Sequence, residues 1–181
     1  MIFVITITVW NIGNLKRDQL VIYAIPGKTL ISLQEHKKGL YIGDSAIIYD
    51  SKQLRLNTYR NLIASGISFH HSPRYLIGNR IETDNLLADC KIISANSLRI
   101  LYLDQSYYSR RMDERIKVDI ILLAHNPKVK FNELKKYFDF KQVVFDGSNA
   151  PWKIKQWKSD CKKYAVKFND INENGAMIID I

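Results

Sequence analysis

The chain has 181 residues, of which 46% are hydrophobic and 11% aromatic, so it is long and apolar enough to fold around a sizeable core, and intrinsic disorder is excluded. Lys and Arg number 27 against 18 Asp and Glu, and the net charge of +9 favours polyanionic partners such as nucleic acid or an anionic membrane surface. The alternative is a basic domain with no such partner.

The first predicted element is the apolar run over residues 2–10. It is far shorter than the roughly 20 apolar residues that a membrane-spanning helix needs. It also lacks the basic leader and the small-residue cleavage site of a signal peptide. The pattern alone therefore predicts a strand.

The next segment predicts an antiparallel meander. Pro26-Gly27 and a polar turn separate three expected strands, over residues 20–25, 29–33 and 40–44. Asp44 closes the third strand, and a single Asp at a strand end is interpreted as a turn former. Short antiparallel strands of this kind fit one sheet of a sandwich.

Residues 51–81 contain no acidic residue, and they hold the candidate nucleic-acid-binding residues Lys52, Arg55, Arg60, Arg74 and Arg80. Cations interleaved with aromatic residues suit a phosphate backbone and unstacked bases. A solvated helix followed by an aromatic-rich loop is the alternative. The helix is expected to bury one face made of Leu54, Tyr59, Leu62 and Ile63.

The segment 84–115 predicts a hairpin and a loop. Strands over 91–94 and 98–104 flank the turn Asn96-Ser97. Residues 106–115 carry Tyr and Arg side chains and are expected to form an exposed loop. Cys90, in this segment, and Cys161 allow one disulfide at most, and a buried free thiol is expected for Cys161.

The C-terminal third predicts strand, helix, strand, helix and strand, over 118–124, 131–138, 142–145, 151–163 and 176–181. The three strands are expected in one sheet, with the helices packed on one of its faces. Pro151 suits the first turn of the second helix, with Ser148 or Asn149 as its cap. The buried stripe of that helix is expected to hold Ile154, Trp157, Cys161 and Tyr164, and its solvated face Lys153, Lys155 and Lys158.

Four segments carry a family resemblance: 118–127, 141–149, 152–158 and 174–176. They resemble the C-terminal end of ComEC-type competence proteins, the membrane channels of DNA uptake, and most of all those of Bacteroidota. The resemblance is specific over residues 117–181 and looser over 20–116. It implies the α/β class, of α+β type: an αββα sandwich like a partial or degenerate metallo-β-lactamase fold, with a mixed sheet and helices on the outer faces.

The resemblance also implies a location at the membrane and a set of binding partners. Residues 1–12 would be the stub of a transmembrane helix and 18–181 a single domain at the inner membrane. Its partners would be single-stranded or double-stranded DNA and the membrane channel portion of the same or a parent protein. The resemblance places the domain on the extracytoplasmic side, whereas Lys16-Arg17 beside a membrane stub favours the cytoplasmic side. The side of the membrane is therefore left open.

A hydrolytic metallo-β-lactamase site needs several His and Asp ligands around its metal ions, usually as His-x-His-x-Asp-His. The chain lacks that motif, and of its four histidines only His125 falls on a family histidine. Asn126 and Pro127 stand where active members have a second histidine and a glycine. His125 is thus interpreted as a vestigial site position, in a non-catalytic domain without metal or cofactor.

Two alternatives remain open. One is a metal-dependent hydrolase or nuclease whose ligands come from His125, His70, His71, Asp104 and Asp146. As neighbours on a strand, however, His70 and His71 would point to opposite faces. The other is a basic structural module with no nucleic-acid role. No small-molecule substrate is evident, because the chain has neither a nucleophile elbow, a phosphate-binding loop nor a paired-cysteine zinc site.

Overall fold

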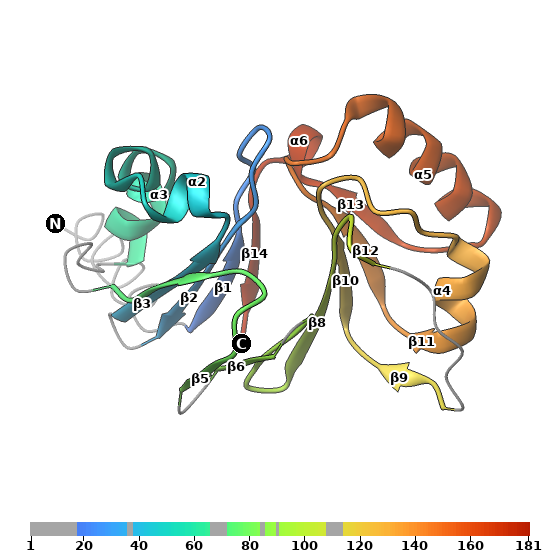
Figure 1. The fold of residues 1–181 in the computed structure, drawn as a ribbon, viewed down its shortest axis with the longest axis horizontal. Helices are drawn as coiled ribbons and strands as arrows, with labels where there is room; N and C mark the ends of the chain where they lie inside the picture. Colours follow the sequence, from blue (N-terminus) through green and yellow to red (C-terminus); the bar gives the residue numbers. More distant parts are fainter. Residues whose placement is uncertain (1–17, 36–37, 66–71, 84–85, 90, 108–113) are drawn as a thin grey trace, which may run out of the picture.

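A computed structural model describes residues 18–35, 38–65, 72–83, 86–89, 91–107 and 114–181. Two β-sheets pack face to face, and helices cover the outer face of each (Figure 1). This arrangement confirms the expected mixed α/β sandwich. The predicted stub 1–12, as well as His36, His70, His71 and Cys90, lies outside the described residues. Within them, no helix is long and apolar enough to cross a membrane.

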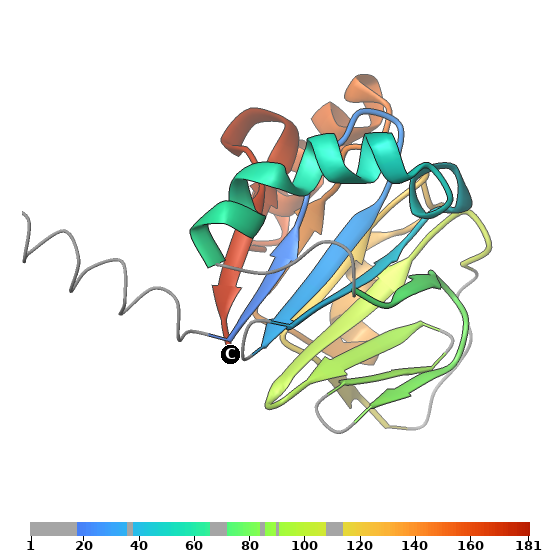
Figure 2. The same cartoon turned by 90° about the vertical axis from the view of Figure 1, so that its left-hand side faces the viewer.

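The first sheet has five strands in the order β14-β1-β2-β3-β4. Their bounds are Met177–Asp180, Gln19–Ile22, Leu30–Glu35, Lys38–Gly43 and Arg74–Leu76. The predicted meander is confirmed, since β1, β2 and β3 pair antiparallel in chain order. Two helices lie on its outer face, α2 (Ser45–Ile48) and α3 (Ser51–Ser65), and Figure 2 shows α3 crossing in front of the strands.

The second sheet has seven strands in the order β13-β12-β10-β8-β7-β6-β5. Their bounds are Phe168–Asp170, Gln142–Phe145, Ile120–Leu123, Leu98–Leu103, Ile92–Ala95, Leu86–Asp89 and Ile81–Thr83. The predicted hairpin is confirmed as β7 and β8, with Asn96 at φ 51° in its turn. A short parallel pair, β9 (Ile116–Lys117) and β11 (Phe138–Asp139), accompanies this sheet.

Helices α4 (Phe131–Tyr137) and α5 (Pro151–Lys163) cover the outer face of the seven-stranded sheet, and α6 (Ile171–Asn174) follows β13 (Figure 1). The predicted stripe on α5 is confirmed for Ile154, Trp157 and Cys161, which are buried there, whereas Tyr164 is the C-cap residue and is only partly buried. Burial raises the pKa of the Cys161 thiol to about 12, which keeps it protonated and unreactive at neutral pH.

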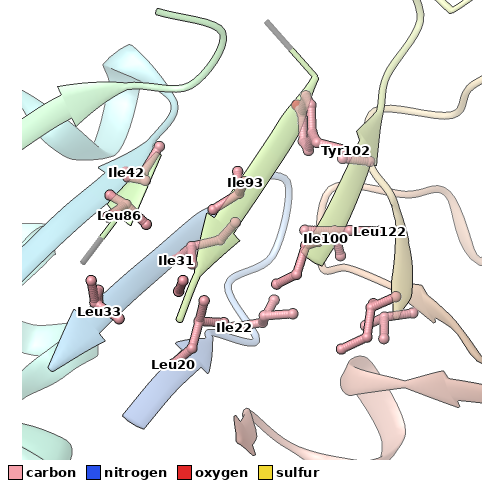
Figure 3. Packing of buried hydrophobic residues seen from close by; sticks show 14 of the residues in the cluster. Leu20, Ile22, Ile31, Leu33, Ile42, Leu86, Ile93, Ile100, Tyr102 and Leu122 are labelled. Carbon is pink, nitrogen blue, oxygen red and sulfur yellow. The ribbon is translucent and has the colours of Figure 1, made fainter. Parts of the chain in front are cut away.

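Three hydrophobic layers result from alternation along the strands. In β10, Ile120 and Leu122 face the other sheet, whereas Ile121 and Leu123 face α4 and α5. Burial on both faces explains the unbroken apolar run of this strand. Figure 3 shows the central layer, where side chains of the two sheets meet, and a third layer lies between the five-stranded sheet and the helices α2 and α3.

The last strand is where the sequence prediction is wrong. β14 does not join β10 and β12 but lies at the edge of the other sheet, antiparallel to β1. The place beside β12 is taken by β13, a strand that the sequence analysis did not expect. The chain then turns through α6 and Gly175, whose φ of 80° favours glycine, and enters the first sheet.

Three side-chain predictions on the helices also need correction. On α3 the buried residues are Leu54, Thr58 and Leu62, while Tyr59 and Ile63 are exposed. The α5 cap is Ala150 without a side-chain hydrogen bond, although Pro151 does occupy the first turn. Lys158 does not belong to a solvated face, because its ammonium lies 2.6 Å from Asp170 Oδ2 and 2.7 Å from Glu173 Oε2.

Candidate functional site

Strand register brings four polar residues from distant parts of the chain to one edge of the sandwich. Leu123 of β10 pairs with Phe145 of the parallel β12, so the residues that follow, His125 and Asp146, leave the sheet at the same edge. Gly43 of β3 pairs with Leu30 of β2, which places Asp44 beside Thr29. Hydrogen bonds between the two pairs then join the two sheets here.

His125 is held by Asp44. Its Nε2 lies 3.1 Å from Asp44 Oδ1 and 3.0 Å from Oδ2, and the Thr29 amide donates to Oδ2 at 2.7 Å. The hydrogen bond with Asp44 raises the pKa of His125 above its ordinary value. The imidazole is therefore oriented by a carboxylate whose two oxygens are both engaged within the protein.

Asp146 is fully buried. The hydroxyl groups of Thr29 and Ser148 donate to Oδ2 and Oδ1 in short hydrogen bonds, and Oδ1 also accepts from the Ser148 amide at 3.0 Å and from Asn149 Nδ2 at 3.0 Å. Burial nevertheless raises the pKa of the Asp146 carboxyl to about 6, because loss of water penalises the anion more than the donors stabilise it.

The loops after β10 and β12 are bound to each other by side chains. Ser148 Oγ accepts from the His125 amide at 2.7 Å, Asn149 Oδ1 from the Asn126 amide at 2.8 Å, and Asn126 Oδ1 from the Ala150 amide at 2.7 Å. His125 and Asn126 are left-handed, at φ 54° and 58°, and this bonding fixes the conformation. It also explains why neither Ser148 nor Asn149 caps α5.

Gly147 permits a close backbone contact between the loop after β12 and the turn after β1. A side chain there would begin with a Cβ 2.2 Å from the carbonyl oxygen of Ile25, so only glycine fits. The Gly147 carbonyl in turn accepts from the Gly27 amide at 2.8 Å. The turn between β1 and β2 is thereby fixed against the loop that follows β12.

The other members of the expected ligand set do not complete a metal site among the described residues. Asp104 binds Lys91 Nζ at 2.6 Å and the Ser106 hydroxyl at 2.6 Å. His70 and His71 lie outside the part of the chain that is described. Within that part, no three His, Cys, Asp or Glu side chains are grouped so that they could hold a metal ion.

A protein-family model, the ComEC C-terminal domain, matches residues 20–181. The chain belongs to this family. The match confirms the resemblance, both over residues 117–181, where it is specific, and over 20–116, where it is looser. The ComEC family ties the chain to membrane-associated proteins of DNA uptake in natural competence. Comparison with curated proteins gave no match.

Beside the His125 loop, this ComEC C-terminal domain has an open cleft of about 710 Å³. Its walls include Gly27, Asn126 and Gly147 from the bonded loops and Ile154 and Lys155 from α5. Ser148 and Asn149, which bind Asp146 and the loop after β10, also line it, so the cleft adjoins the His125 network.

The basic candidates lie elsewhere in the ComEC domain. Lys52, Arg55 and Arg60 are exposed on α3, and Arg74 on β4 donates to Ser51 Oγ at 2.7 Å, which places its guanidinium at the start of that helix. Arg80 follows β4 and pairs with Glu82 at 3.4 Å instead. The structure therefore gathers Lys52, Arg55 and Arg74 near one end of α3, and we call these three residues the basic end of α3.

Sequence reasoning missed two members of the site, Thr29 and Asp44. Asp44 was interpreted as a turn former, yet its carboxylate makes no capping hydrogen bond to α2, although it occupies the cap position. Its partner His125 is 81 residues away in the chain. The only sequence signal is the position of Asp44 at the end of a predicted strand, which is where site residues of a sandwich lie.

Proposed function

We propose that this chain is a non-catalytic domain of a ComEC-type DNA-uptake protein, with a degenerate metallo-β-lactamase-like sandwich. The observation that carries the proposal is that the acidic groups around His125 are already used. Asp44 accepts from His125 and Thr29, and Asp146 accepts from two hydroxyl groups and two nitrogen donors.

A hydrolytic metal centre has the opposite requirement. Its carboxylates and imidazoles must point free lone pairs at the cation and leave one position for water. To serve as a ligand, Asp146 would have to give up hydrogen bonds inside a buried environment that already raises its pKa. The polar residues at this edge therefore favour a structural role, joining the two sheets.

Metal analysis tests this proposal. After dialysis against metal-free buffer, the protein should contain no stoichiometric zinc, manganese or iron, and a chelator should leave its Tm unchanged. Added Zn²⁺ or Mn²⁺ should not produce cleavage of labelled DNA. One or two metal ions per chain, or cleavage that a chelator stops, would replace this proposal with the nuclease alternative.

We also propose that DNA is contacted at the basic end of α3. Support comes from the three cations gathered there and from the lack of acidic residues over 51–81. Cations on a helix surface neutralise phosphates without reading bases, so binding should be independent of sequence and weaken steeply with salt.

The matching test replaces Lys52, Arg55 and Arg74 with Ala and measures fluorescence anisotropy of a labelled single-stranded oligonucleotide across a salt series. Each lost phosphate contact should lower the salt slope by about 0.7, hence by about 2 for the triple variant. The control replaces Lys155, Lys162 and Lys163, which are exposed on α5. Equal losses in both variants would show that net charge alone drives binding.

Residues 18–181 are proposed to act as one domain next to the membrane channel portion of the same or a parent protein, on the extracytoplasmic side. The family match supports the membrane association, since it ties the chain to membrane-associated uptake proteins, and the extracytoplasmic side rests on the resemblance alone. Protease added to spheroplasts should degrade the domain if it lies outside the inner membrane. Protection until the cells are lysed would instead place it in the cytoplasm.

A further inference from the structure

Helix α3 carries apolar side chains on its exposed surface as well as on its buried face. Leu54, Thr58 and Leu62 are buried against the five-stranded sheet. On the other side Leu56, Tyr59 and Ile63 are exposed by 65%, 51% and 63%. A helix with apolar residues on two faces ordinarily has a partner on both, and among the described residues only the first of these faces is covered.

The exposed residues form one continuous stripe. Positions 56, 59 and 63 are spaced i, i+3 and i+7, so at 3.6 residues per turn they lie above one another along the helix. Single exposed Leu or Ile residues are common, but a contiguous apolar stripe on a protein surface marks a binding site. We call Leu56, Tyr59 and Ile63 the outer stripe of α3.

Cations border the outer stripe on both sides. At 100° per residue, Arg55 lies on one side of the stripe and Arg60 on the other, and Lys52 precedes Leu56 by one turn. All three are exposed, and α3 has no acidic residue. Apolar side chains flanked by cations are complementary to a surface with an apolar interior and an anionic outer layer.

We infer that the outer stripe of α3 binds the surface of an anionic lipid bilayer, with the helix lying parallel to the membrane. Leu56 and Ile63 would enter the boundary between headgroups and acyl chains, and Tyr59 would sit at that depth with its hydroxyl in the polar layer. Arg55 and Arg60 would extend their apolar stems along the stripe and reach lipid phosphates.

A bilayer fits these residues better than DNA or a protein does. DNA offers phosphates to the arginines but little that matches two exposed aliphatic side chains between them. An acidic amphipathic helix offers both features, but the family places the domain in membrane-associated proteins, where a bilayer is always within reach. Arg55 belongs both to the border of the outer stripe and to the basic end of α3, so lipid phosphates and DNA phosphates would compete for it.

Vesicle flotation tests the inference on the full chain. Wild-type protein should float with vesicles of phosphatidylcholine and phosphatidylglycerol, and much less with phosphatidylcholine alone. Leu56→Ser combined with Ile63→Ser should reduce the partition coefficient about tenfold or more, because both side chains lose their apolar contact with lipid. Arg60→Gln should reduce it about fivefold on anionic vesicles only.

The matched control is Trp152→Ser on α5, which removes another exposed apolar residue, 67% exposed, beside Lys153. It should leave flotation unchanged. All of these side chains are exposed, so thermal unfolding should show that every variant remains folded. Lack of flotation by the wild type, or unchanged flotation of the double variant, would overturn the inference. Two other results in the double variant would also overturn it, if flotation stayed intact. A loss of self-association would show that the stripe binds a second copy, and a loss of oligonucleotide binding would show that it binds DNA.

Discussion

At the scale of single residues, the fold surrounds the Asp146 carboxyl with donors and yet raises its pKa from 3.8 to about 6. Because the folded-state pKa lies above the unfolded one, the folded chain holds a proton on this group more tightly. The stabilisation that this proton gives to the folded chain is fully present below about pH 4 and is lost as the pH rises through 6. At neutral pH the buried anion therefore costs stability, by about 3 kcal/mol for a shift of this size.

Asp146→Asn should remove that pH dependence. The amide keeps an acceptor for Ser148 and Asn149 and gains a donor that the Thr29 hydroxyl can accept, and it carries no charge. At pH 8 the variant should be as stable as the wild type or more stable, whereas below pH 4 any advantage should vanish. Urea unfolding at a series of pH values measures this difference. A variant that is much less stable at pH 8 than the wild type would show that the ionised carboxylate is required.

His125 titrates in a separate window. Its pKa is raised by the hydrogen bond with Asp44. Protonated His125 therefore stabilises the folded chain fully below the unfolded-state pKa of about 6.5, and this stabilisation declines as the pH rises through the higher folded-state pKa. Both groups thus make the wild type less stable as the pH increases, with Asp146 acting between about 4 and 6. Only the upper window should remain in the Asp146→Asn variant.

The sequence could identify His125 and Asp146 as candidate site residues, but not Thr29 and Asp44. His125 follows a strongly apolar strand within a recognisable family segment, so a local pattern was enough. Thr29 and Asp44 become site residues only because β2 and β3 pair in the register that joins Leu30 to Gly43, and because the two sheets meet at Gly147. An Asp after a strand looks the same in a sequence whether it forms a turn or holds a histidine 81 residues away.

At the scale of elements, helices and strands with strong periodicity were predictable and their sheet membership was not. β12 and α5 have the predicted bounds, because a short apolar run and Pro151 are local signals. β14 has an alternation of half-buried and exposed residues that suits the edge of either sheet. Its place is decided by β13, a three-residue strand too short for a sequence pattern, which fills the edge beside β12.

Trp157 provides the prediction at this scale. Its side chain is 1% exposed, and its ring lies 5.7 Å from that of Phe145 on β12. Trp157→Ala should lower the free energy of unfolding by about 3–5 kcal/mol, because it leaves a cavity between α5 and the sheet. Urea unfolding followed by circular dichroism measures the loss. Trp152→Ala, five residues earlier and exposed, should cost less than about 0.5 kcal/mol, and equal losses at both positions would contradict the packing of α5.

At the scale of the whole molecule, the two sheets share one core. Ile22 and Ile31 of the first sheet belong to the same buried cluster as Ile100 and Leu122 of the second (Figure 3). The chain also crosses between the sheets, since β14 returns from the second sheet to close the first beside β1. Separating the sheets would expose the central layer of both, so neither is expected to remain folded alone.

Residues 18–181 should therefore unfold as one cooperative unit. Ile22→Ala truncates a fully buried side chain on the inner face of β1, and the cavity should cost about 2–5 kcal/mol. If the sheets fold together, this destabilisation should speed amide hydrogen exchange in both sheets. Hydrogen exchange monitored by mass spectrometry should then show lower protection in β10 and β12 of the seven-stranded sheet as well as in β1 and β2. A loss confined to β1 and β2, or two separate unfolding midpoints for the two groups of strands, would mean that the sheets are independent units. The shared central layer makes the first result the expected one, because the lost contacts of Ile22 belong to side chains of both sheets.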